Sequence, residues 1–394
     1  MRHWRGLDGL RAVAVIAVIA DHAYVFSGGY LGVDVFFVLS GFLITTLLID
    51  EWDRRGGRIS FSAFYARRVL RLFPALAVLL VVTAAIAGLL LAGNPTYDRP
   101  FAAATFDAIP AVALFAGNWV RAVDSSSVTG SLGLLGHTWS LAVEEQFYLI
   151  WPAVFAVLAR RRIGRGGLAA LLGLAAVADM AYRAVAHAHG YGNDRIYFGA
   201  DTHCDGLLAG CALAFWLASA GPAGLGQLGR LPRLLLRRAA WPAAVVLAAL
   251  LVFASWPGLA LETSGAVLAT ALLVAAVAAG ELPAPIGAML GSELAVAIGR
   301  RSYGIYLWQY VLIALAQLLC APYTGTFPVP AGPRRLVFSV ALAAAAAAAF
   351  AAAQLSYRYV ELPALRRKRR FGSAPDQDQP AVAGVGDVPA GQPG

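Results

Sequence analysis

The sequence predicts an all-α membrane protein with about ten transmembrane helices. Apolar residues make up 59% of the 394-residue chain and charged residues only 13%, about half the charged share of an ordinary soluble domain. Long apolar segments recur along the whole chain. Helices suit such segments because a helix satisfies its backbone hydrogen bonds internally, without water.

Ten segments are long enough to cross a bilayer, which requires roughly 20 mostly apolar residues. In chain order they cover residues 10–28, 31–50, 70–92, 141–159, 167–187, 200–219, 240–256, 263–280, 301–320 and 336–357. Basic residues precede the first segment, as in a signal peptide, but no small-residue cleavage site ends it cleanly. We therefore expect it to be retained as the first span.

The basic residues predict the orientation of these spans. With both termini in the cytoplasm, 25 of the 31 basic residues fall in cytoplasmic segments, as the positive-inside rule requires. The 6 that fall outside are Arg99, Arg121, Arg183, Arg195, Arg334 and Arg335. We expect a multi-pass protein of the plasma membrane with cytoplasmic N- and C-termini. The net charge of +9 then reflects topology and contact with membrane lipid, so no nucleic-acid partner is expected.

Two regions outside the helical bundle are predicted. The membrane domain is expected to cover residues 1–365 and to include a long external loop over about 93–136. Prolines and a run of serines in this loop favour irregular structure, with one short half-buried helix around residues 108–117. Residues 366–394 hold a basic cluster and then a Gly-, Pro- and Ala-rich sequence without periodicity, which predicts a disordered cytoplasmic tail.

Ionisable residues interrupt the first predicted span. Ten residues separate Arg11 from His22; nine are apolar and the tenth is Asp21. Eleven helical steps cover about 16 Å and return almost to the starting angle, so both side chains leave the same face. Arg11 is then expected at the cytoplasmic surface and His22 near mid-membrane, where ionisable groups usually face a bundle interior or wet cavity. The alternative is a purely structural histidine, bonded to Asp21 or to a neighbouring helix.

The fourth and sixth predicted spans also carry polar residues. The fourth begins "HTWSLAVEEQFYLIWP", in which Glu144 shares a helix face with Tyr148 and Trp151. Glu144 is therefore the better candidate for a polar cavity, and Glu145 for an interfacial or helix N-terminal role. The alternative is that both simply cap a helix beginning near Ser140. The sixth span opens with "DTHCDG" at residues 201–206. Spacing alone does not determine whether these groups meet in space.

These motifs resemble the acyltransferase 3 family, bacterial integral-membrane O-acyltransferases that modify polysaccharides, lipid-linked sugars and antibiotics. The resemblance covers about residues 5–365. The motifs appear in the order "LDGLRAVAV…DH", "GVDVFFVLSGFLI", "FYARRVLRLFP", "HTWSLAVEEQFYLIWP", "DTHCDGLLAGCALA", "RRSYGIYLW" and "YRYVELP". Longer fused members add a serine-type esterase domain after the membrane part. We expect none here, because only a short tail follows.

The resemblance implies a binding site for an acyl-CoA co-substrate, with acetyl-CoA the expected donor, and neither a permanently bound cofactor nor a metal. Arg68 and Arg71 match the family's arginine pair, implicated in holding the nucleotide phosphate at the cytoplasmic face. Arg11 matches the family's signature arginine before the histidine. Arg67 adds a further basic side chain for the anionic coenzyme, and the alternative for Arg67 is ordinary positive-inside charge.

The resemblance also implies that His22 is the residue essential for acyl transfer. Moving an acyl group from a thioester to a hydroxyl requires removal of the hydroxyl proton, for which a histidine is suited. A carboxylate could fix the histidine tautomer and stabilise the imidazolium. Asp21 is adjacent in sequence but points about 100° away on a helix, and Glu144 matches the glutamate of the family motif. Both remain candidates for this supporting role.

Substrate contacts are expected near the starts of the second, fourth and sixth spans. The candidate residues are Asp34, His137, Trp139, Asp201 and His203. For Asp34, a purely structural hydrogen bond is an equal alternative. Many relatives carry a histidine where this chain has Gln309, so proton transfer at position 309 is in doubt while hydrogen bonding is retained.

The function implied is transfer of an acyl group, expected to be acetyl, from acyl-CoA to a hydroxyl of a sugar or other polyol. The acceptor stays open among a cell-surface glycan, a glycolipid and a macrolide-type metabolite. The alternative function is a proton-coupled membrane transporter that uses the buried His and Glu residues. The absence of visible internal repeats in the sequence weakens this alternative.

Overall fold

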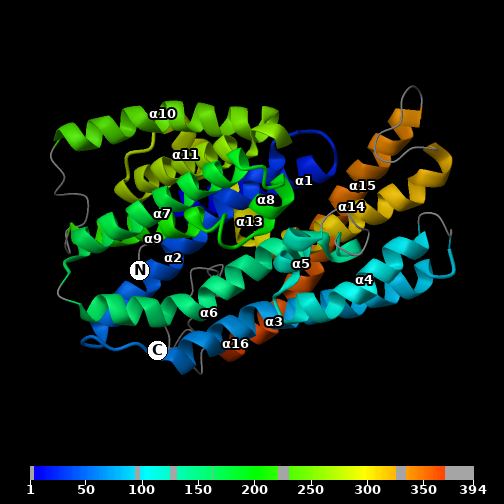
Figure 1. Cartoon of the computed structure of the whole chain (residues 1–394), viewed down its shortest axis with the longest axis horizontal. Helices are drawn as coiled ribbons and strands as arrows, with labels where there is room; N and C mark the ends of the chain where they lie inside the picture. The colour runs from blue at the N-terminus through cyan, green and yellow to red at the C-terminus, as the bar shows by residue number, and fades with distance from the viewer. Residues whose placement is uncertain are drawn as a thin grey trace, which may run out of the picture.

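The computed structural model describes residues 4–93, 98–124, 131–161, 163–220, 230–324 and 334–368, and every regular element in these ranges is helical. The helices are α1 (Arg5–His22), α2 (Gly32–Arg54), α3 (Phe61–Leu90), α4 (Asp98–Ala113), α5 (Gly117–Val123), α6 (Trp139–Arg160), α7 (Arg165–Ala188), α8 (Asn193–Phe198), α9 (Asp205–Ser219), α10 (Arg230–Phe253), α11 (Leu259–Ala279), α12 (Ala284–Leu290), α13 (Glu293–Arg300), α14 (Ser302–Thr324), α15 (Arg334–Ser356) and α16 (Leu362–Lys368). The 3-10 turns η1 (Gly29–Leu31) and η2 (Gly133–Thr138) precede α2 and α6. Figure 1 shows α10 along one edge of the bundle and α3 with α16 along the opposite edge. The predicted all-α class is confirmed.

Eight helical segments of the described chain are long and apolar enough to cross a membrane. A helix also occupies each of the ten predicted positions, but two of these helices do not meet the same criteria. α1 is 18 residues long and carries charged residues along its length. α9 has only 15 residues. The structure therefore agrees with a multi-pass membrane protein, while the count of ten spans stays a prediction.

α3 starts earlier than the sequence predicted. It begins at Phe61 rather than near residue 70 and continues for 30 residues, about 45 Å at the usual helical rise. The Ser60 side chain caps it by accepting a hydrogen bond from the backbone N–H of Ala63. Arg68 and Arg71 therefore lie on a rigid helix rather than on a loop.

The predicted irregular loop over residues 93–136 is largely wrong for the part that the structure describes, although the short helix predicted around residues 108–117 overlaps the end of α4. α4, α5 and η2 occupy most of it. Pro100 lies in the first turn of α4, where a missing backbone N–H removes no helical hydrogen bond. Residues 94–97 and 125–130 lie outside the described residues, as does the predicted disordered tail beyond residue 368.

α1 lies between two apolar cores. Its residues Leu10 and Ala14 pack into the core formed mainly by α2, α7, α9 and α11, while Val15 and Ile19 pack into the core of α3, α4, α14 and α15. α2 is the most enclosed span: 72% of its apolar window is buried, against 22% for α10. The last turn of α1, which ends at His22, therefore stands where the two cores meet.

Glycines bring α2 and α9 into backbone contact. A Cβ atom added at Gly41 would lie 2.0 Å from the carbonyl oxygen of Leu207, and one added at Gly210 would lie 2.2 Å from that of Val38. Small residues allow this close approach of helices. The pairing of α2 with α9 therefore depends on both glycines.

Gly41→Ala is expected to destabilise the protein by about 1–3 kcal/mol, because the added methyl group must push α9 away from α2. Gly88→Ala is the matched control, since nothing lies within 4 Å of a Cβ atom added at this glycine of α3. The control should be neutral or stabilising by roughly 0.5–1 kcal/mol, as alanine is the better helix former. Thermal unfolding in detergent compares the two; equal effects would contradict the close packing.

Candidate active site

His22 is joined to α14 through its ring. Nδ1 lies 2.8 Å from Oε1 of Gln309. Because an amide oxygen only accepts hydrogen bonds, Nδ1 carries the ring proton and Nε2 carries the free lone pair. Nε2 makes no hydrogen bond within the part of the chain that the structure describes. His22 is thus fixed at one nitrogen and available as a base at the other.

A second histidine lies close to His22, across the ring of Tyr310. The rings of His22 and Tyr310 meet edge-on with centroids 4.9 Å apart, and His137 stacks on Tyr310 at 5.0 Å. His137 is 1% exposed, and neither of its ring nitrogens has a hydrogen-bond partner of normal geometry among the described residues. The hydroxyl of Tyr306 donates to the backbone oxygen of His137 at 2.9 Å.

A row of polar groups continues from His137 along one face of α6. We name His137, Ser140, Glu144 and Tyr148 the α6 track. Ser140 and Tyr306 share a hydrogen bond of 2.6 Å between their hydroxyls. The hydroxyls of Ser40 and Tyr148 both donate to Oε1 of Glu144. These residues recur every three or four positions, so they share one helix face over about 16 Å.

Arg68 stands at the far end of the α6 track. Its guanidinium lies 4.0 Å from the centroid of the Tyr148 ring, a cation–π contact. Glu145, predicted to have an interfacial or helix N-terminal role, is half-buried with its Oε1 enclosed, and it lies within electrostatic range of both Arg68 and Arg71. Polar side chains on one face of α6 thus lie between the two histidines and Arg68, one of the predicted donor arginines.

The other two predicted donor arginines already have acidic neighbours. Arg67 pairs with Glu51 of α2 at 3.3 Å. Arg11 lies 3.8 Å from Asp8, one turn before it on α1. Neither contact reaches the α6 track.

A buried cation lies near the two histidines. Arg121 of α5 donates to the backbone oxygen of Gly136 at 2.8 Å, and its guanidinium lies 3.9 Å from the centroid of the Phe198 ring. Its charge is close enough to act on both His22 and His137. Burial lowers the pKa of Arg121, but an arginine starts far above neutrality and keeps its charge.

His203 belongs to a separate, closed cluster. Its Nε2 lies 2.8 Å from Oδ1 of Asp34, and its Nδ1 lies 2.6 Å from the backbone oxygen of Tyr197. Trp139 stacks on the ring with centroids 5.8 Å apart. Since both nitrogens of His203 face acceptors and the ring is 1% exposed, His203 lacks the free lone pair that His22 has.

Two arginine–aspartate pairs flank this cluster. Arg183 is 1% exposed and donates to both carboxylate oxygens of Asp205, at 2.9 and 2.8 Å. Sequence reasoning placed Arg183 in an external segment and missed this pair. Asp201, predicted to contact substrate, pairs with the partly exposed Arg195 at 2.6 Å, and the bond raises the pKa of that arginine.

Asp21 and Glu144 were the two candidates for supporting His22, and no hydrogen bond between either carboxylate and the His22 ring occurs among the described residues. Asp21 faces the backbone at Gly29 and Tyr30. Glu144 lies farther along the α6 track. The ring partner is Gln309 instead. Tyr306 and Tyr310 were also missed, although their spacing in "SYGIYLWQY" places them on one face with Gln309.

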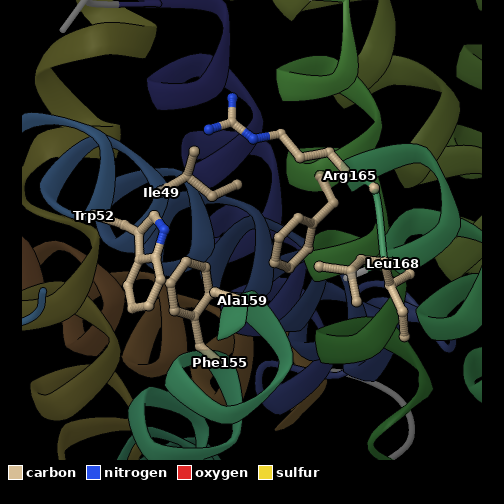
Figure 2. Close-up of a pocket in the computed structure, with 9 residues that line it drawn as sticks. Ile49, Trp52, Phe155, Ala159, Arg165 and Leu168 are labelled. Atoms are coloured by element: carbon tan, nitrogen blue, oxygen red, sulfur yellow. The ribbon is translucent and has the colours of Figure 1, made fainter. Parts of the chain in front are cut away.

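An apolar cavity lies near the C-terminal end of α2. It has a volume of about 220 Å³ and is lined by residues of α2, α6, α7 and α9 and of the segment between α6 and α7. The rings of Trp52 and Phe155 lie next to each other at its wall (Figure 2). Arg165, its one charged lining residue, is paired with Asp53. The cavity therefore offers no nucleophile or base.

Comparison with known proteins identifies the family. A family model described as "Acyltransferase domain" matches residues 4–357, nearly all of the described chain. The chain belongs to this acyltransferase family. The match includes His22, the α6 track and Arg68, so the site described above lies within the family domain.

Curated relatives of this chain are named as O-acetyltransferases. The peptidoglycan O-acetyltransferase OatA of Listeria monocytogenes is 34% identical over 370 residues, which cover 91% of this chain and 55% of the relative. The O-acetyltransferase OatA of Staphylococcus aureus is 32% identical over 373 residues, covering 93% and 58%. The acyltransferase thus spans a little over half the length of these relatives. No solved structure matches it.

Family membership favours an enzyme over the transporter that the sequence left open. An acyltransferase needs a base near a thioester, and the described site supplies a histidine with a free nitrogen. The predicted recognition of the family is confirmed.

The two arginine–aspartate pairs should differ sharply in their contribution to stability. Arg183→Met leaves the carboxylate of Asp205 buried without its partner, which is expected to cost about 3–5 kcal/mol of unfolding free energy. Arg195→Met removes the partly exposed pair with Asp201 and is expected to cost about 0–1 kcal/mol. Unfolding measurements on both variants check this. A near-neutral Arg183→Met would show that Asp205 is not held by that arginine.

Proposed function

We propose that this acyltransferase moves an acetyl group from acetyl-CoA to a hydroxyl of a cell-surface glycan. One observation carries the proposal: His22 has one nitrogen fixed by Gln309 and the other without a described partner. The site stands at one end of the α6 track, with Arg68 at the other end. His22 as the base and Arg68 as the anion-binding group thus lie at opposite ends of the α6 track.

The donor is expected to bind with its phosphates at Arg68 and Arg71 and its pantetheine arm along the α6 track. Guanidinium groups form strong, often bidentate hydrogen bonds to phosphate. The hydroxyl and carboxylate groups at Ser140 and Glu144 offer polar partners along the way, suited to the amide groups of the arm. The reactive thioester would then reach His22 while the nucleotide stays at the bundle end. Arg67 and Arg11 are proposed to add positive potential at that end.

The chemistry at His22 is a general-base transfer. Nε2 takes the proton from the acceptor hydroxyl while the hydroxyl oxygen attacks the thioester carbonyl carbon. A carbon–oxygen bond forms, the carbon–sulfur bond breaks, and the departing sulfur receives the proton from the imidazolium. The buried charge of Arg121 favours negative charge that develops on the carbonyl oxygen.

The acceptor is proposed to be a cell-wall sugar, because a relative named as a peptidoglycan O-acetyltransferase matches 91% of this chain. The aromatic and polar groups of His137 and Tyr310, which lie beside His22, suit contact with a sugar ring. A glycolipid and a macrolide-type metabolite carry the same hydroxyl chemistry, and the assay below distinguishes them as acceptors.

We also propose ten spans in the plasma membrane with both termini in the cytoplasm. Ion pairs of Arg67 with Glu51 and of Arg165 with Asp53 gather the ends of α2, α3 and α7 at one end of the bundle. Basic residues on that end agree with a cytoplasmic position. α1 and α9 complete the count of ten, because buried polar residues are tolerated where helices face protein rather than lipid.

His22→Ala is expected to lower acetyl transfer by about 10²–10⁴-fold, since positioned proton transfer contributes about that much to rate. The purified protein in proteoliposomes is given labelled acetyl-CoA and, in parallel, glycan oligomers, a glycolipid or a macrolide, and the acetylated product is counted. Binding of acetyl-CoA to His22→Ala should stay within a few-fold of wild type.

The matched control is His189→Ala, because His189 is exposed and the described hydrogen bond of its ring goes to the backbone oxygen of Val185 in α7. This variant should transfer at the wild-type rate. Unchanged transfer by a folded His22→Ala would overturn His22 as the base. Failure of both proteins to engage acetyl-CoA would overturn the proposed donor.

A further inference from the structure

We propose that Gln309 is a positioning residue that selects the reactive tautomer of His22. The proposal rests on the proposed function, since it assigns how His22 is made ready to act. Gln309 lies on α14 and is fully buried. Its Oε1 is 2.8 Å from Nδ1 of His22, a normal hydrogen-bond distance.

A neutral imidazole carries its proton on either nitrogen, and only one of these tautomers has a lone pair on Nε2. The amide oxygen of Gln309 cannot donate, so it bonds only the form with the proton on Nδ1. A bond at Nδ1 also fixes the plane of the ring. Gln309 thereby holds both the proton and the lone pair of His22 in place before substrate arrives.

The neutral amide also limits how strongly the imidazolium is stabilised. A carboxylate at this position would attract the charged ring and raise its pKa. The transfer cycle needs His22 to take a proton from the acceptor and return it to the sulfur, so an overly stable imidazolium would oppose the second step. An uncharged acceptor at 309 suits a base that must work in both directions.

α14 holds His22 at three points. Besides the Gln309 bond, the ring of Tyr310 packs against the imidazole edge, and Nε2 of Gln317 donates to the backbone oxygen of His22 at 2.9 Å. Of these contacts, only the one from Gln309 reaches a ring nitrogen. The other residues can place the last turn of α1, but they cannot choose a tautomer.

The unpaired amide nitrogen of Gln309 supports a role for this residue beyond stability. Its Nε2 is buried and has no hydrogen-bond partner within the described ranges. A buried unsatisfied donor costs free energy, so an apolar side chain would stabilise this position better if packing were its purpose. The one described polar contact of the side chain is the one to His22.

Two variants test the proposal in acetyl-transfer assays across pH. Gln309→Leu removes the acceptor and is expected to lower kcat about 10- to 100-fold with KM for acetyl-CoA within about twofold, because loss of the tautomer affects chemistry and not donor binding. Gln309→Glu keeps an acceptor of nearly the same shape and adds charge. The carboxylate raises the pKa of His22, so the acid limb of the kcat profile should move to higher pH by about one unit or more.

Gln317→Leu is the matched control, because it is the same substitution on the same helix and removes a contact to the His22 backbone. It should lower thermal stability and leave the acid limb where the wild type has it. Thermal unfolding of every variant identifies losses that arise from misfolding.

A folded Gln309→Leu with wild-type kcat, or a Gln309→Glu whose acid limb coincides with that of the wild type, would overturn the proposal. Either result alongside an inactive His22→Ala would remove only the positioning role. Wild-type transfer by His22→Ala would instead overturn the proposed function itself.

Discussion

The hydrogen bond between His22 and Gln309 is the contact on which this site depends. It joins the last turn of α1 to α14 at the place where two apolar cores meet. Each core alone would leave the imidazole facing hydrocarbon side chains, where an unpaired polar ring is costly. Together the two helices satisfy one ring nitrogen and leave the other without a described partner. The fold thus anchors this histidine at one nitrogen and leaves the other open, and the tight packing on either side of α1 keeps its position fixed.

Two groups of buried polar side chains in this molecule differ in how they are paired. Asp34 pairs with His203 and Arg183 with Asp205, although Oδ2 of Asp34 and Nε of Arg183 have no hydrogen-bond partner among the described residues. Such a network rigidifies the bundle around α2 and α9. Around His22 the pairing is incomplete: His137 and the Gln309 amide have unmet groups among the described residues. Unmet polar groups in a buried site are places where a substrate can bind with gain.

The sequence was most informative about helices and least informative about partners. Apolar runs of about 20 residues identify helices well, and a helix occupies each of the ten predicted positions. Only the end of α4 was predicted, as a short helix around residues 108–117, because its prolines resemble loop signals, although Pro100 lies harmlessly in a first turn. The partner of His22 lies 287 positions away in the chain, so no local spacing pointed to it. Adjacency suggested Asp21 and the family motif suggested Glu144, yet each carboxylate is directed elsewhere. Arg183 was assigned to an external segment by counting charges. Such a count carries no information on Asp205, the buried aspartate with which Arg183 pairs.

The central claim is that donor and base share one path along the α6 track. The most direct measurement is a structure of the protein with a non-reactive thioether analogue of acetyl-CoA. Our account predicts nucleotide phosphates against Arg68 and Arg71, the pantetheine arm beside Ser140 and Glu144, and the acetyl group next to Nε2 of His22. An analogue bound with its acetyl group in the apolar cavity at Trp52 and Phe155, away from His22, would contradict the account.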